Sequence, residues 1–150
     1  MRVFESLDAL RSAIGEDLGT SDWHTVTQEQ INTFADATGD HQWIHVDVAR
    51  AAQGPFGTTI AHGFLTLALL PMLTHQVYTV NGISMAINYG CNRVRFPAPL
   101  PSGSRVRAHV TVVGAEDIPG GLQVVTVVQV EVENGAKPCC VAEAVSRFLA

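Results

Sequence analysis

Residues 62–73 read HGFLTLALLPML, and this apolar stretch decides the fold. A helix over these residues has almost no polar face, and helices that are apolar all round are usually buried. The stretch is too short to cross a bilayer, which takes roughly 20 apolar residues. Pro71 lies inside it, where a proline should kink or end a helix. We therefore expect a buried central helix, bent or ended near Pro71.

The sequence after this helix changes to a period of two. Apolar and polar residues alternate over 106–112, 124–132 and 140–148, and a further strand is expected over 83–95. Turn signals rich in proline and glycine separate these segments. The pattern predicts an α+β fold in which a meandering antiparallel sheet wraps around the long central apolar helix. Since no linker or repeat divides the chain, residues 1–150 are expected to form one domain.

The N-terminal part carries helix signals. Apolar residues at helical spacing predict a short amphipathic helix over 3–14. Residues 27–30 read TQEQ, a capping box that opens a helix over 28–38. Gly39 should end that helix, because glycine tolerates the left-handed conformation common just past a helix C-terminus. Asp47 is expected to cap a second short helix over 48–52.

Composition narrows the classes of partner. The net charge is −5, so the chain lacks the basic field that favours binding to nucleic acid or to an anionic membrane. The expected partners are small molecules and a second copy of the chain. The N-terminus lacks the apolar stretch of a secretory signal, which favours the cytoplasm. The three cysteines form neither a disulfide framework nor a CxxC ligand pair.

Asp40 and His45 lie between the two predicted helices, five positions apart. A carboxylate and an imidazole held close together can bind one water and transfer its protons. Spacing alone more often indicates a loop cap and a surface histidine. The histidines lack a HExxH motif or a Cys–His constellation, so no metal site is expected.

Longer motifs surround this pair. Residues 34–40 read FADATGD, residues 44–47 read IHVD, and residues 56–63 read FGTTIAHG. Together with the later segment RFPAP at 95–99, they resemble the MaoC-like, R-specific enoyl-CoA hydratase family, and within it the nodulation-protein-N-like branch. The resemblance implies a hot-dog fold, in which the sheet wraps the long helix. It also implies a homodimer whose chains pair edge to edge, with active sites near the interface.

The resemblance further implies reversible syn hydration of a trans-2-enoyl-CoA to an (R)-3-hydroxyacyl-CoA, in fatty acid metabolism. Asp40 then acts as the principal base on water, and His45 holds the water and relays the proton. The backbone N–H of Gly63, at the predicted helix start, is the candidate donor to the thioester oxygen, and His62 supports the carbonyl pocket. Coenzyme A is part of the substrate, so no separate cofactor is expected.

The chain departs from the family at Gln42 and Trp43, where most members carry Asn-Pro. A proline fixes φ in the loop that bears the catalytic pair, whereas tryptophan adds a large apolar surface instead. These two residues are therefore expected to decide how the loop is supported.

Four arginines are the candidates for contact with the phosphates of coenzyme A, although their pattern is mainly that of the polar side of strands. They are Arg93, Arg95, Arg105 and Arg107.

Two other functions stay open. A hot-dog thioesterase would use a similar carboxylate to direct water onto the carbonyl carbon. A non-catalytic acyl-CoA-binding subunit would not need the pair, and the retention of both Asp40 and His45 counts against it.

Overall fold

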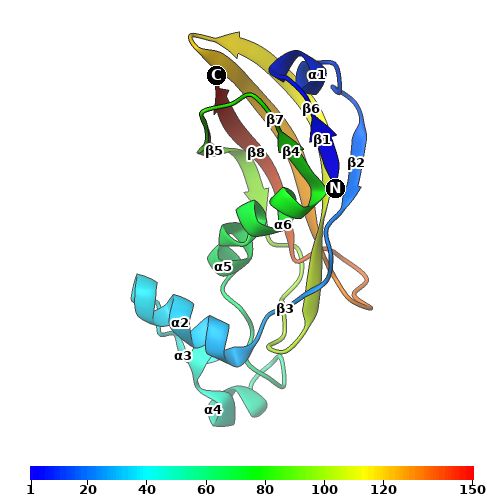
Figure 1. Ribbon diagram of the computed structural model, residues 1–150. Coiled ribbons are helices and arrows are strands. Elements are labelled where there is room, and N and C mark those ends of the chain that lie inside the picture. Colours follow the sequence, from blue (N-terminus) through cyan, green and yellow to red (C-terminus); the bar gives the residue numbers. More distant parts are fainter.

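A curved antiparallel sheet forms the main layer of the protein, which we describe from a computed structural model of residues 1–150 (Figure 1). Its strand order is β2-β6-β7-β8-β5, with β3 also paired to β6. A separate parallel pair joins β1 to β4. The bounds are β1 (Arg2–Phe4), β2 (Asp17–Thr20), β3 (His24–Thr25), β4 (Tyr78–Val80), β5 (Met85–Arg95), β6 (Arg105–Ile118), β7 (Gly121–Val132) and β8 (Cys140–Leu149).

The predicted period-two segments are confirmed as strands. In β6 and β7, buried residues alternate with less buried ones, because successive side chains point to opposite faces of the sheet. The predicted meander holds for β6, β7 and β8 only. β5 precedes β6 in the chain but pairs with β8, at the edge opposite β2.

The apolar segment forms two helices, α5 (Gly63–Ala68) and α6 (Leu70–Val77), on one face of the sheet (Figure 1). The expectation of one long apolar helix is therefore not confirmed. Pro71 lies in the first turn of α6, where its missing N–H is tolerated, and the helices meet at Leu69. Burial is also one-sided, since the side chain of Phe64 is 69% exposed.

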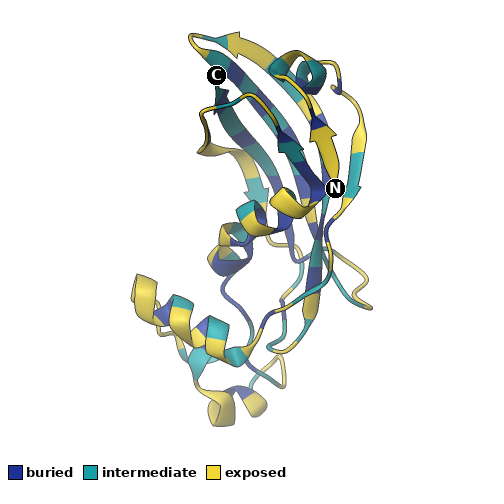
Figure 2. Cartoon of the chain, in the orientation of Figure 1, coloured by how far each residue is buried: buried dark blue, intermediate teal, exposed yellow.

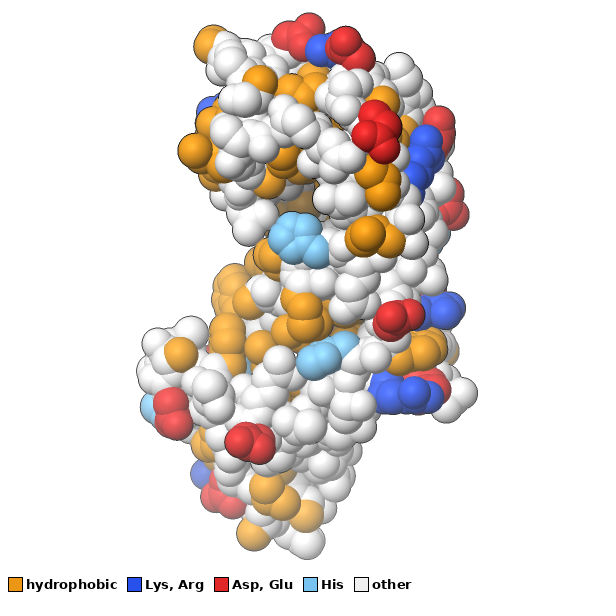
Figure 3. All heavy atoms as spheres, viewed as in Figure 1, with side chains coloured by type: hydrophobic (Ala, Val, Ile, Leu, Met, Phe, Trp, Pro, Cys, Tyr) orange, Lys and Arg blue, Asp and Glu red, His pale blue; other side chains and the backbone are white.

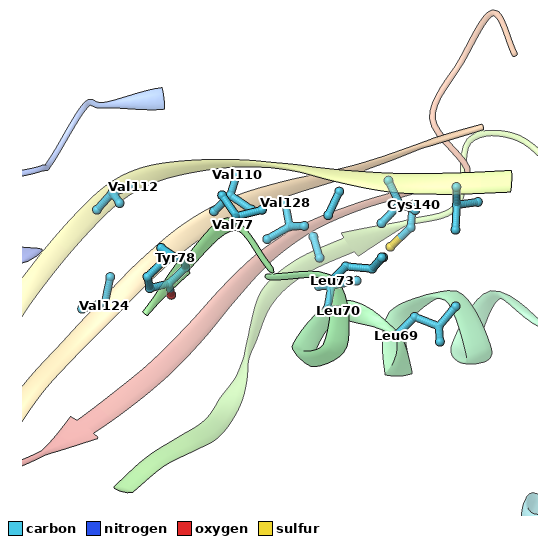
Figure 4. Packing of buried hydrophobic residues seen from close by; sticks show 14 of the residues in the cluster. Leu69, Leu70, Leu73, Val77, Tyr78, Val110, Val112, Val124, Val128 and Cys140 are labelled. Carbon is cyan, nitrogen blue, oxygen red and sulfur yellow. The ribbon is translucent and has the colours of Figure 1, made fainter. Parts of the chain in front are cut away.

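The core lies between these helices and the sheet. Leu69, Leu70, Leu73 and Val77 pack against valines of β6 and β7, within a cluster of 26 buried residues (Figure 4). Fully burying one such side chain contributes about 1.5–3 kcal/mol. This packing fixes α5 on the sheet and thereby fixes the residues at its start.

Three further helices, α2 (Gln28–Thr38), α3 (Trp43–Val46) and α4 (Val48–Ala52), gather at one end of the molecule, away from β1 (Figure 1). The Oγ1 of Thr27 accepts a hydrogen bond from the N–H of Gln30 at 3.1 Å, and Gly39 ends α2 with φ of 79°. The other half of the predicted capping box is wrong, because the side chain of Gln30 contacts His24 at 3.0 Å. Asp47 caps α4, as predicted.

The helix expected over 3–14 is wrong in its first part. β1 (Arg2–Phe4) replaces its beginning, and only α1 (Leu7–Arg11) is helical. Phe4 is buried in β1, which pairs with β4 far along the chain. No helix of the structure has the length and apolarity needed to cross a bilayer.

Candidate active site

The structure brings Asp40, His45 and His62 together. Asp40 follows the left-handed Gly39, and α3 then makes a single turn, in which the N–H of His45 donates to the carbonyl of Gln42 at 3.0 Å. One polar atom from each of the three side chains lies within 4.8 Å of the other two. Asp40 is exposed, whereas His45 is only 6% exposed and His62 only 2%.

The ring of His45 has a fixed orientation. Its Nδ1 lies 2.7 Å from the carbonyl oxygen of Ile60. Because a carbonyl only accepts hydrogen bonds, Nδ1 must carry the hydrogen, and the neutral ring keeps its lone pair on Nε2. The side-chain amide of Gln28 also donates to the carbonyl of His45 at 2.7 Å, and its oxygen accepts from the buried hydroxyl of Thr59. His45 is thus held through its ring and through its backbone.

His62 has a more central place than the sequence indicates. Its Nε2 donates to the backbone carbonyl of Asp40 at 3.0 Å, so it connects the start of α5 to the loop after α2. Its ring stacks on that of His45 with centroids 3.8 Å apart and 24° between the planes, and the ring of Phe34 lies 4.9 Å away. The Nδ1 of His62 is buried without a hydrogen-bond partner.

The stacked rings bear on metal binding. Asp40, His45 and His62 are ligand types for a transition metal. A metal bound by histidine lies near the plane of the ring, about 2.0–2.1 Å from the nitrogen. Two nearly parallel rings, stacked 3.8 Å apart, cannot both contain one ion in their planes. The stacked arrangement therefore does not fit a metal ion that both imidazoles bind.

Gly63 begins α5, and the preceding His62 makes no side-chain cap. The first N–H groups of a helix have no acceptor within the helix, so the N–H of Gly63 is available to a ligand at this end. A Cβ added at Gly63 would lie 2.7 Å from a ring carbon of Phe96. The ring of Phe96 therefore lies so close to Gly63 that it leaves no room for a side chain at this position.

Gln42 and Trp43 support the loop in different ways. The N–H of Gln42 donates to Oδ1 of Asp40 at 3.3 Å, a long bond, and its side chain caps nothing. The ring of Trp43 lies against the guanidinium of Arg50, 4.3 Å from the ring centroid, and a Cβ at Gly54 would lie 3.1 Å from the ring. Trp43 thus packs against α4 at Arg50 and against Gly54 just after that helix, so side-chain contact replaces the fixed φ of a proline.

The four arginines separate into two groups. Arg105 and Arg107 form cross-strand ion pairs with Glu133 and Glu131. Arg93 and Arg95 are exposed on β5 and form no ion pair. These two are the better candidates for phosphate contact.

Three groups that orient His45 are not marked by any sequence pattern. Gln28 follows the capping Thr27 and looks like any exposed first-turn residue. Thr59 and the carbonyl of Ile60 lie inside the motif at 56–63. This motif resembles that of the family, but it does not show that the Thr59 hydroxyl points to Gln28 or the Ile60 carbonyl to His45.

Some of the known proteins similar to this chain are named as dehydratases or hydratases. A family model described as "MaoC like domain" matches residues 9–134. The 3-hydroxyacyl-thioester dehydratase Z of Mycobacterium tuberculosis (strain H37Rv) is 65% identical over 151 residues, covering 100% of both chains. Nodulation protein N of Rhizobium leguminosarum bv. viciae is 46% identical over 140 residues, which cover 91% of this chain and 87% of that protein.

The fold is shared with solved structures. The R-hydratase PhaJ1 from Pseudomonas aeruginosa, in its unliganded form, has a TM-score of 0.73 and 26% identity, covering 91% of this chain and 81% of that one. A monoamine oxidase regulatory protein from Archaeoglobus has a TM-score of 0.79 and 29% identity, covering 99% of this chain and 95% of that one.

Proposed function

The chain belongs to the MaoC-like domain family, which has the hot-dog fold, and from this premise we propose that it is a hydro-lyase acting as an R-specific enoyl-CoA hydratase. It would add water reversibly and syn to a trans-2-enoyl-CoA, giving an (R)-3-hydroxyacyl-CoA in fatty acid metabolism. The observation that carries the proposal is the tautomer of His45. With Nδ1–H held by Ile60, the Nε2 lone pair and the Asp40 carboxylate offer two acceptors to the two hydrogens of one water.

Such a water turns its oxygen lone pairs toward the β-carbon of the substrate. As the C–O bond forms, Asp40, assisted by His45, takes one proton, and the electrons of the double bond move toward the thioester oxygen. The N–H of Gly63 would bind that oxygen, and one such donor lowers a barrier by roughly 3 kcal/mol. The same proton then passes to the α-carbon on the same face, which restores the base and makes the addition syn.

No cofactor beyond the substrate's own coenzyme A is part of this proposal. The proton transfers use Asp40 and His45, and the charge on the thioester oxygen uses a backbone donor. His62 supports the site by holding the carbonyl of Asp40 and the face of His45.

We also propose that two chains pair through β5. This strand lies at one edge of the sheet and is exposed over nearly its whole length (Figure 2). It presents Met85, Ile87 and Tyr89 to solvent, and exposed apolar edge strands favour pairing with another chain. Apolar side chains also gather on the surface around α5 (Figure 3), where Phe64 and Phe96 are exposed next to Gly63. A second copy on this edge would enclose the candidate site.

The test is hydration of crotonyl-CoA, or of a longer trans-2-enoyl-CoA, followed as loss of the enoyl-thioester absorbance, with stereochemical analysis of the product. Replacing Asp40→Asn or His45→Gln should lower kcat by roughly 10²–10⁴, the usual contribution of positioned proton transfer. The matched control is His41→Gln, since His41 is an exposed histidine that contacts Asp36 instead. Its rate should equal that of the parent.

Other outcomes assign other functions. If the Asp40 and His45 variants hydrate as fast as the parent, the site assignment is wrong. Release of free thiol in place of hydration would indicate a hot-dog thioesterase. Binding of acyl-CoA without either reaction would indicate a non-catalytic subunit.

A further inference from the structure

A pocket of about 290 Å³ lies between the helices α5 and α6 and the sheet, beside β5. A smaller hollow of about 140 Å³ extends it toward β4. The space-filling view is hollowed at this place, between β4 and β5 (Figure 3). The two spaces have shared walls, so we treat them as one groove. The shared residues are Pro71, Thr74, Tyr78, Asn88 and Ser146.

The groove follows the helix face that starts at Gly63. Leu67, Leu70 and Thr74 line it, and they lie 4, 7 and 11 positions after Gly63. Gly63 and Leu67 share one face of α5, and Leu70 and Thr74 share one face of α6. At 1.5 Å per residue, the path from Gly63 to Thr74 covers about 16 Å of helix, divided at Leu69 between α5 and α6. An acyl chain whose thioester oxygen meets the N–H of Gly63 can therefore extend into this groove, a step that rests on the proposed function.

Three polar side chains, those of Tyr78, Asn88 and Ser146, line the groove where the two spaces meet, and none of them makes a hydrogen bond within the protein. Beyond them, toward β4, Val80, Ile83 and Phe148 line the groove. Tyr78 is only 9% exposed, and its ring stands beside Val77 at the end of α6 (Figure 4). Burial raises the pKa of Tyr78 to about 12, so its hydroxyl stays a hydrogen-bond donor at neutral pH. By contrast, Leu67, Leu70 and the sheet residue Val128 line the near part.

A purely hydrocarbon tail would displace water from these three polar groups and would offer them no hydrogen-bond partner in its place. Leaving a buried donor or acceptor without a partner is costly, whereas an oxygen on the tail would satisfy it. We propose that the groove selects trans-2-enoyl thioesters whose acyl chain carries a hydroxyl or keto oxygen at the depth of Tyr78, with Tyr78 and Asn88 as its hydrogen-bond partners. Tyr78 is then a specificity-determining residue.

The experiment compares kcat/KM for trans-2-enoyl-CoA substrates of one length. One has a saturated tail, and the others carry a single hydroxyl at successive positions along it. The parent should prefer the substrate whose hydroxyl lies about 16 Å or more from the thioester by about tenfold, the effect of one satisfied hydrogen bond. Tyr78→Phe should bring that ratio close to one. Ser12→Ala is the control, because it removes an exposed hydroxyl at the end of α1, outside the groove and away from β5, and it should keep the preference.

A second variant, Asn88→Ala on the exposed β5, tests the same groove without disturbing the core, and it should also reduce the ratio. Equal kcat/KM values of the parent for all tails would overturn the proposal. An unchanged preference in both Tyr78→Phe and Asn88→Ala would overturn it too. Either result would leave the hydratase assignment intact. Failure to hydrate even crotonyl-CoA would instead overturn the proposed function, and this inference with it.

Discussion

Replacing Gln28→Leu should both destabilise the protein and slow hydration. The side chain of Gln28 donates to the carbonyl of His45 at 2.7 Å and accepts from the hydroxyl of Thr59, which is 1% exposed. Each hydrogen bond contributes about 1 kcal/mol net, and each buried group left unpaired costs about 1–3 kcal/mol. Leucine fills a similar volume without bonding, so the free energy of unfolding should fall by about 2–4 kcal/mol. Urea unfolding measures this change.

The effect on rate follows from the position of His45. Without Gln28, the carbonyl of His45 loses its side-chain donor, and the ring keeps only its bond to Ile60 and its stacking on His62. We therefore expect kcat to fall by about tenfold, a loss of roughly 1.4 kcal/mol in transition-state stabilisation. The control is Asn32→Ala, which removes only the third, exposed bond of Gln28 and should change stability by less than about 0.5 kcal/mol. If Gln28→Leu behaves like this control in both measurements, Gln28 does not position His45.

Two further predictions concern packing and thiol chemistry. Gly63→Ala should lower the free energy of unfolding in urea by about 1–3 kcal/mol, because the new Cβ would lie 2.7 Å from the ring of Phe96. In a protein that already carries Phe96→Ala, the same Gly63→Ala change should cost less. Burial raises the pKa of Cys139 to about 12 and that of Cys140 to about 11, so both stay protonated at pH 8, and a thiol reagent followed by mass spectrometry should modify them only after denaturation. Rapid labelling of either thiol in the native protein would contradict the burial.

Sequence patterns predict the parts of the fold that depend on local periodicity. The alternation in β6 and β7 and the capping of α2 by Thr27 are local features, and the structure confirms them. The pairing of β1 with β4 is not local, and the apolar spacing near Phe4 matched a helix equally well. The position of β5 beside β8 likewise depends on a crossover that no local pattern records. Pro71 indicated a break in the apolar segment, but only the structure locates it at Leu69.

For the candidate site, the residue types could be read from the sequence but their directions could not. The spacing of Asp40 and His45 alone did not distinguish the pair from a loop cap and a surface histidine, and the longer motifs around them, which resemble those of the family, singled it out. The lone pair of His45 is directed by the carbonyl of Ile60, and every residue has a carbonyl, so no side-chain pattern marks this one. His62 was expected only to support the carbonyl pocket, because a sequence cannot show that its ring stacks on His45.

The stacked histidines also explain how a second imidazole can lie so close to the pair without competing for the water. The Nε2 of His62 already donates to the backbone carbonyl of Asp40 at 3.0 Å, so this nitrogen offers no lone pair to a water. The other nitrogen, Nδ1, is buried, and the ring stacks on that of His45 with centroids 3.8 Å apart. His62 therefore fixes the loop at Asp40 and the ring of His45 through contacts that do not use the water. In the proposed mechanism, the proton removed from water is left to Asp40 and His45, which is what delivery to the same face of the substrate requires.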